Sequence, residues 1–352
     1  GGIEPTSSHG IAMLAYIATI LTSGLFVVCS ALSLYWIALQ LGAGSGGATF
    51  VALAFGLGTP VWIFATLFFG HAAAMGSLML GFAATIRLRD ARTSRSQWWL
   101  ALGVGVAVGW ATVIEFTAAP PALCIVVLAL AYAWRGSWAQ RLRVGRALAL
   151  GTGAAAAVLV TYNQLAFGAP FRLGYSYVEG FAGMKQGVMG LTYPRAEVLQ
   201  EILLGQFRGV LPLAPWLVLA PIGVFILARS RKTRMIPLVA LGIGFYYILL
   251  NASYYYWDGG SSYGPRHLLP GIPFLCVSIG PLWKRTQGFC RALMVVAVLW
   301  GVGISLVAVS THVMPHRGFK RPISQVLWPA FRYGNMSTPS VTYEGVYVPR
   351  TQ

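Results

Sequence analysis

The chain has 352 residues, of which 57% are hydrophobic and only 9% are charged. Water-soluble domains carry about 25% charged residues, so this composition excludes an ordinary soluble domain and predicts an all-α, polytopic membrane protein. The formal net charge is +17, but the basic residues occur in short clusters between apolar runs. That arrangement is typical of loops that orient membrane helices and not of a nucleic-acid-binding surface. We therefore expect membrane lipids, and no nucleic acid, as partners.

Long apolar runs recur along the chain and predict about ten membrane segments. In chain order the runs cover 11–40, 48–69, 72–86, 98–115, 119–134, 147–166, 211–228, 236–251, 268–283 and 292–312. Several are shorter than the roughly 20 residues that an untilted span requires, and Pro60, Pro120 and Pro121 mark expected kinks or helix starts. We expect residues 1–314 to form one transmembrane domain and residues 315–352 to form an external tail, either a small ordered cap or a loose end.

Four basic clusters orient these segments. They lie at 87–95, 135–146, 229–234 and 284–291 and hold 15 of the 25 Lys and Arg residues. Alternating segments place all four clusters on one face, which the positive-inside rule makes cytoplasmic, and Asp90 is the only one of the eight acids on that face. The remaining acids then lie outside with the loops 167–210 and 252–267. We predict a multi-pass protein of the bacterial cytoplasmic (inner) membrane whose active face is extracytoplasmic.

The same alternation places the N-terminus outside, although the first ten residues, GGIEPTSSHG, lack the features of a signal peptide. A preceding span would resolve this. We therefore expect at least one helix, and the external loop after it, upstream of Gly1.

The first long outer loop is aromatic and mixed in charge, and it includes Tyr175 and Arg208. Within it, PRAEVLQEILLGQF has apolar residues close to a helical period, which predicts an amphipathic helix lying at the membrane interface.

Five ionisable residues at predicted helix ends or in outer loops are candidate site residues, because a charge at membrane depth is costly and is often kept for function. They are His71, Glu115, Asp258, Arg266 and His267. Each also has a structural interpretation. His71 could satisfy a turn carbonyl, Glu115 could face headgroups or pair with Arg266, Arg266 could anchor the interface, and Asp258 could be the Asp-Gly turn residue. Arg beside His favours contact with the phosphate of a lipid headgroup.

The order of five segments resembles the bacterial relatives of the protein O-mannosyltransferases, within the GT-C superfamily of polytopic glycosyltransferases. The segments are LGTPVWIFATLFFGHA (57–72), VGWATVIEFTAAPPAL (108–123), TYNQLAFGAPFRLGY (161–175), LLGQFRGVLPLAPW (203–216) and WDGGSSYGPRHLLPGIPF (257–274). The resemblance covers about 60–314 and implies a GT-C fold. It also implies transfer of a sugar from a polyprenyl-phosphate donor to an extracytoplasmic acceptor that the sequence does not identify.

The resemblance also implies site residues. The family's main catalytic acid lies in the first external loop, which we expect upstream of Gly1, so Glu115 and Asp258 are the remaining catalytic candidates. The substrate-binding candidates are Arg266 and His267 for the lipid phosphate, Arg208 in support, and His71, Tyr175 and Tyr263. We predict no cofactor and no metal, since the outer acids lack metal-ligand spacing. Two other functions stay open: a transporter or flippase of a lipid-linked substrate, and a non-catalytic membrane scaffold of the same fold.

Overall fold

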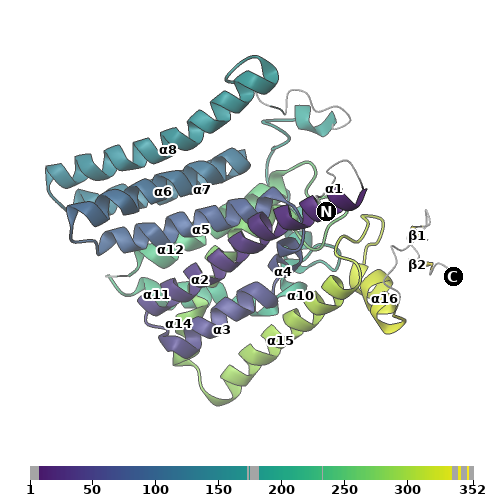
Figure 1. Ribbon diagram of the computed structural model, residues 1–352. Coiled ribbons are helices and arrows are strands. Elements are labelled where there is room, and N and C mark those ends of the chain that lie inside the picture. The colour runs from purple at the N-terminus through teal and green to yellow at the C-terminus, as the bar shows by residue number, and fades with distance from the viewer. Residues whose placement is uncertain are drawn as a thin grey trace.

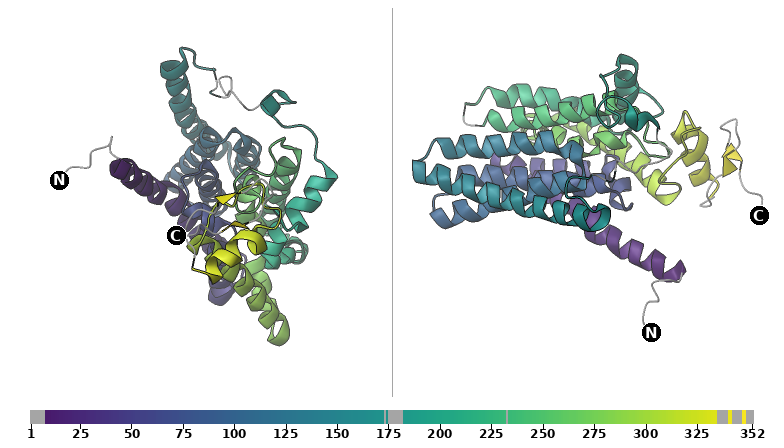
Figure 2. Two further views of the ribbon diagram at one scale, coloured as in Figure 1. Left: turned by 90° about the vertical axis from the view of Figure 1, so that its right-hand side faces the viewer. Right: turned by 90° about the horizontal axis from the view of Figure 1, so that it is seen from above.

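The computed structural model describes residues 8–172, 174, 182–231, 233–334, 340–341 and 347–348. Within these ranges the chain forms a helical bundle whose long helices run side by side, with shorter helices and loops at the two ends (Figure 1). Helix α1 extends away from the bundle, as the two turned views show (Figure 2).

The first half of the described chain is almost entirely helical. Its elements are α1 (Ser8–Thr19), the π-helix η1 (Ile20–Gly24), α2 (Leu25–Gln40), α3 (Gly44–Leu57), α4 (Val61–Ala65), α5 (Gly70–Arg89), α6 (Ser94–Ile114), the 3₁₀ helix η2 (Phe116–Ala118), α7 (Ala119–Trp134) and α8 (Trp138–Phe167).

The second half is more interrupted. Its elements are η4 (Ala182–Lys185), α9 (Ala196–Leu204), α10 (Val210–Leu213), η5 (Pro215–Leu219), α11 (Ala220–Ala228), α12 (Met235–Ser253), η6 (Arg266–Gly271), α13 (Ile272–Cys276), α14 (Ile279–Arg285), α15 (Gly288–Ser310), the π-helix η7 (Ile323–Leu327), α16 (Trp328–Arg332) and the two-residue strands β1 (Ser340–Val341) and β2 (Tyr347–Val348), which pair antiparallel. Proline accounts for several of the breaks, since Pro215, Pro221, Pro270 and Pro273 lie at or near helix starts or inside short helices.

Six helical stretches of the described chain are long and apolar enough to cross a membrane. They are Gly10–Gln40, Ser94–Ile114, Phe116–Trp134, Trp138–Phe167, Met235–Ser253 and Gly288–Ser310. This confirms the sequence-based prediction of a helical, multi-pass membrane protein. The other expected segments fall on α5 and on runs of shorter helices, so the count of ten stays a prediction.

The loops that carry the basic clusters join α5 to α6, α7 to α8, α11 to α12 and α14 to α15. The opposite end of the bundle, which we call the outer end, carries α10 and α16 (Figure 1), and α9 packs there against the end of α12. The helix predicted in the first outer loop is confirmed as α9, with Val198 and Ile202 buried and Glu197 in its first turn. The positive-inside rule predicts that this end lies outside the cytoplasm.

The first part of the C-terminal tail is an ordered cap on the outer end. Phe319, Val326 and Leu327 are fully buried, and the Ser262 amide donates a hydrogen bond to the Pro315 carbonyl at 3.2 Å. Residues 315–334 therefore belong to the fold of the outer end and are not a loose appendage.

Helices α6 and α8 pack backbone against backbone through small residues. A Cβ atom placed on Gly105 would lie 2.4 Å from the Leu148 carbonyl oxygen, and one placed on Gly151 would lie 2.5 Å from the Leu102 carbonyl oxygen. Close approach through small residues is how membrane helices associate when lipid removes the hydrophobic driving force between them.

We expect Gly105→Leu to separate α6 from α8 and to cost at least about 1–3 kcal/mol, the usual penalty of overpacking. Gly103→Leu is a matched control on the same helix, because no atom lies within 4 Å of a Cβ at that position. Thermal unfolding of the two variants in detergent tests this, and equal melting temperatures would contradict the predicted close packing.

Candidate functional site

A cavity of about 400 Å³ opens at the outer end of the bundle. It lies where the start of α5, the turn between α6 and η2, the end of α12 and the start of η6 meet, with residues 184–191 of the outer loop beside them. Its lining comprises His71, Glu115, Phe116, Thr117, Ala119, Pro120, Met184, Val188, Met189, Leu191, Tyr246, Leu250, Tyr254 and His267. Three of the ionisable candidates, His71, Glu115 and His267, therefore share one cavity.

The carboxyl group of Glu115 lies against the His71 ring, with Glu115 Oε1 in close contact with His71 Nδ1, and the two side chains are 14% and 16% exposed, respectively. Glu115 ends α6 in an extended conformation, which turns the chain into η2. The carboxylate approaches the first residue of α5, where a Cβ on Gly70 would lie 3.4 Å from Glu115 Oε1. The positive end of the α5 dipole stabilises the carboxylate there. Of the structural alternatives for Glu115, pairing with Arg266 does not occur, because its partner is His71.

His267 is largely buried, and its ring packs edge-on against two others, with centroids 5.4 Å from His71 and 4.8 Å from Tyr254. Its Nε2 lies 3.2 Å from the Tyr256 carbonyl oxygen. Because a carbonyl only accepts, Nε2 carries the hydrogen and donates it. Burial lowers the pKa of His267 well below its ordinary value, and the neighbouring His71 and Arg266 lower it further.

A neutral His267 with its hydrogen on Nε2 presents only a lone pair at Nδ1. It therefore cannot donate a hydrogen bond to a phosphate oxygen in this state. The resemblance implied a phosphate-binding role for His267, which stays a prediction, and in this state its Nδ1 is a hydrogen-bond acceptor.

We expect acidification below about pH 6.5, the ordinary pKa of histidine, to destabilise the fold through His267. The unfolded chain takes up this proton before the folded protein does, so stability falls with decreasing pH by at most about 1.4 kcal/mol per pH unit. His267→Gln should flatten the fall in melting temperature on acidification, whereas His316→Gln, at an exposed position on the same end, should not. An unchanged pH dependence in the His267 variant would contradict this origin.

Arg266 lies beside the cavity and not in its lining. Its guanidinium is over the rings of Phe69 at 5.6 Å and Tyr256 at 5.9 Å. Burial lowers the pKa of Arg266, while the charges of Asp258 and Glu115 and two tyrosines oppose that effect. Its Nε is buried without a hydrogen-bond partner among the described residues. Within the described residues, acidic side chains contact basic ones only at His71–Glu115 and Arg89–Asp90. A half-buried cation of this kind is suited to an anionic ligand.

Arg208 is fully buried and holds the second outer loop together. Its guanidinium donates hydrogen bonds to the carbonyl oxygens of Asp258 at 2.9 Å and Gly260 at 2.6 Å. Burial lowers the pKa of Arg208 to about 10, which still leaves the group charged at neutral pH. Three of its five N–H donors bond backbone carbonyls, so Arg208 positions the loop that leads to Arg266, and its expected support of phosphate binding stays a prediction.

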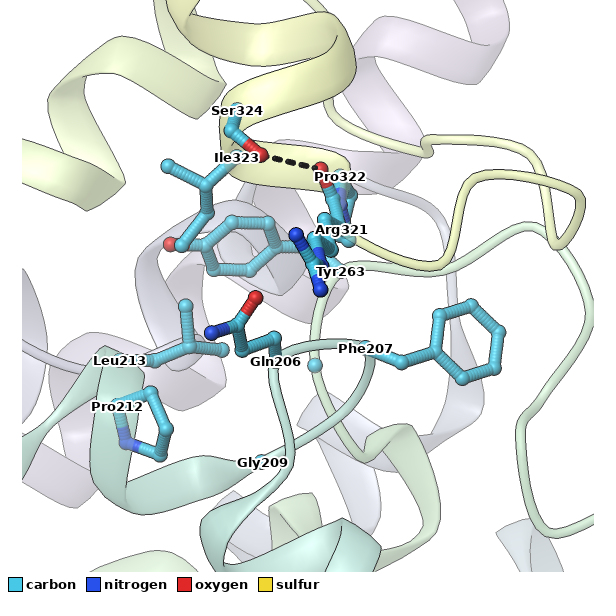
Figure 3. A pocket seen from close by; sticks show the side chains of 11 residues that line it. Gln206, Phe207, Gly209, Pro212, Leu213, Tyr263, Arg321, Pro322, Ile323 and Ser324 are labelled. Atoms are coloured by element: carbon cyan, nitrogen blue, oxygen red, sulfur yellow. Dashed lines mark hydrogen bonds between the residues drawn. The ribbon is translucent and has the colours of Figure 1, made fainter. Parts of the chain in front are cut away.

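Asp258 and the two tyrosine candidates lie elsewhere. The Asp258 carboxylate accepts a hydrogen bond from the Gly260 amide at 3.2 Å, which supports its interpretation as a turn residue, and Asp258 does not line the cavity. Tyr263 lines a second cavity, drawn in Figure 3. Tyr175 lies outside the described residues.

Sequence reasoning missed two parts of the cavity wall. Tyr246 donates a hydrogen bond to the Thr117 carbonyl at 2.8 Å, across 129 positions of sequence, and Leu191 forms a β-bridge with Tyr254. The aromatic richness of the outer loops was the available signal, but the contacts join segments too far apart in sequence for any local pattern to predict.

Among the described residues, no group of three His, Cys, Asp or Glu side chains is arranged to hold a metal ion. No protein-family model, no curated protein and no solved structure matches the chain.

Proposed function

We propose that the protein is a membrane glycosyltransferase that moves a sugar from a polyprenyl-phosphate donor to an acceptor on the extracytoplasmic side. One observation carries the proposal. At the outer end, a single cavity brings a carboxylate–imidazole pair, Glu115 and His71, beside Arg266, a half-buried cation without an acid partner in the described chain. A base and an anion-binding group at headgroup depth are the two elements that sugar transfer from a lipid phosphate requires.

In the proposed reaction the acceptor hydroxyl oxygen forms a bond to the anomeric carbon as the bond from that carbon to the phosphate oxygen breaks. The configuration of the sugar is inverted. The hydroxyl proton passes to His71 Nε2, since His71 Nδ1 already contacts Glu115. Glu115 holds the imidazole in one orientation and stabilises the imidazolium that forms, as a carboxylate does beside a catalytic histidine.

Arg266 balances the charge of the departing lipid phosphate. Its guanidinium stands over Phe69, whose ring stacks on that of His71 with centroids 6.3 Å apart, so one aromatic ring separates the base from the phosphate-binding cation. His267 Nδ1 accepts a hydrogen bond from a hydroxyl of the sugar or of the acceptor. In this scheme His71 takes up the proton, and Arg266 stays positively charged and stabilises the phosphate.

The arrangement disfavours the two rival functions. Transporters of lipid-linked substrates hold their ligand sites near the bilayer midplane, whereas His71, Glu115, Arg266 and His267 all lie at one end of the bundle. A non-catalytic scaffold would not need a histidine oriented by a carboxylate, as His71 is by Glu115, with its Nε2 left for a ligand of the cavity.

The experiment is reconstitution of the full-length protein, with any upstream sequence, in liposomes that contain polyprenyl-phosphate mannose labelled in the sugar. A membrane extract supplies the acceptor. Transfer of label out of the lipid fraction supports the proposal. Movement of intact donor between leaflets without cleavage would establish a flippase instead, and neither activity across a panel of hexose donors would leave the scaffold function.

A further inference from the structure

A second cavity, of about 220 Å³, lies between the C-terminal cap and the outer loops. Three segments enclose it, 206–213, 263–264 and 321–324, and none of its lining residues lines the first cavity. The capping segment supplies one wall and α10 with the turn before it supplies the other (Figure 3).

Two side chains bring hydrogen-bond donors into this space from opposite walls: the Arg321 guanidinium and the Gln206 carboxamide (Figure 3). The Arg321 backbone is held in place, since its amide donates to Gln325 Oε1 at 2.7 Å and its carbonyl accepts from Ser324 Oγ at 3.3 Å. The guanidinium itself has neither an ion pair nor a hydrogen bond to another described residue, and the lining contains no carboxylate. A guanidinium on an anchored backbone, with an amide opposite and no competing acid, is suited to a phosphate group.

Most of the remaining lining is apolar. Pro212, Leu213, Ile323 and the ring of Tyr263 form it. The carbonyl oxygen of Leu213 lies 3.0 Å from where a Cβ on Gly301 would be. Gly301 is nine residues before the end of α15, and at 1.5 Å per residue this is roughly 14 Å along the helix axis from its outer end. Arg321 follows the end of α15, so the lining extends from the cap, where Arg321 lies, to the level of Gly301 on α15.

A ligand that matches both parts has an anionic phosphate at one end and a hydrocarbon stem at the other. We propose that the second cavity binds an anionic phospholipid of the outer leaflet, with its phosphate at Arg321 and Gln206 and its first carbons against Pro212, Leu213 and Ile323. This site is independent of the proposed sugar transfer, because none of its residues belongs to the first cavity.

The bound lipid joins the C-terminal cap to the loop beside the first cavity. Gly264 lines the second cavity and His267 lines the first, and three residues of chain span at most about 11 Å. Phe207, in the wall of the second cavity, lies under the cations of both Lys320 at 4.6 Å and Arg208 at 4.0 Å. A lipid seated there therefore stabilises the outer loops as well as the cap.

The test is binding of phosphatidylglycerol to the full-length protein in detergent, measured by native mass spectrometry and by the rise in melting temperature. Arg321→Gln removes the charge-assisted hydrogen bonds to the phosphate, and we expect binding about ten- to a hundredfold weaker. Gln206→Glu keeps the size of the side chain but places a carboxylate opposite the phosphate and should weaken binding similarly. Both positions are exposed, so both variants should fold.

Arg332→Gln is the matched control, since it removes the same charge from the same cap at an exposed position outside the cavity. Weakening by Arg321→Gln and Gln206→Glu but not by Arg332→Gln supports the site. Equal weakening by Arg321→Gln and Arg332→Gln would overturn it in favour of general surface attraction. Equally strong binding of glycerol phosphate, which lacks the stem, would overturn it in favour of a site for a small anion. Sugar transfer is scored separately, and its presence or absence bears on neither outcome.

Discussion

Replacing His71 by Ala is expected to slow sugar transfer by about 10²- to 10⁴-fold, the usual contribution of a positioned general base. In the first cavity the Glu115 carboxyl group contacts His71 Nδ1 and orients the ring. Without His71, no oriented base accepts the proton of the acceptor hydroxyl. The measurement is the single-turnover rate of label transfer from polyprenyl-phosphate mannose in liposomes. His316→Gln is the control, an exposed histidine on the same end of the molecule.

Glu115 is a positioning residue in this scheme, and its test differs accordingly. Glu115→Gln should slow transfer more than tenfold and change the pH–rate profile, because the amide keeps the shape of the side chain but no longer stabilises the imidazolium. The double variant Glu115→Gln, His71→Ala should be no slower than His71→Ala alone, since residues that act as one unit are not additive. A double variant slowed by the product of the two single effects would show that the two residues act separately.

Replacing Arg266 by Ala is expected to reduce transfer by about 10²- to 10³-fold while leaving expression intact, because one preorganised charge on the leaving phosphate is worth that much. The side chain is half-buried and has no acid partner in the described chain, so its removal leaves no buried carboxylate unpaired. Transfer is measured as for His71. Arg266→Lys keeps the charge but loses the planar fork, and it should recover part of the rate.

Arg172→Ala is the control for this prediction, since Arg172 is an exposed arginine of the outer loop that lines neither cavity. Unchanged transfer in Arg266→Ala would remove this residue from the phosphate site. Equal losses in Arg172→Ala and Arg266→Ala would indicate a general dependence on positive charge at the outer end.

The helical, multi-pass character of the chain could be predicted because it depends on local composition. An apolar run such as 292–312 is unfavourable in water and favourable in lipid. Because lipid offers no hydrogen bonds, the backbone N–H and C=O groups of such a run must bond one another, so hydrophobicity alone predicts a helix there. The same holds for α9, where apolar spacing predicted the helix that forms. The shorter segments were harder, since proline breaks several of them and neighbouring helices must complete their hydrogen bonding.

The sequence by itself thus determined that the chain crosses a membrane several times, and its basic loops predict which end faces outward. It also singled out His71, Glu115, Arg266 and His267 as ionisable residues near the predicted outer face. Their chemistry was decided only by the tertiary structure. Three of these features depend on contacts between distant segments. Glu115 contacts His71, His267 donates a hydrogen bond through Nε2, and Arg208 donates to backbone carbonyls. Burial and partners set the charge and the hydrogen-bonding capacity of each group, and neither can be read from a residue's neighbours in sequence.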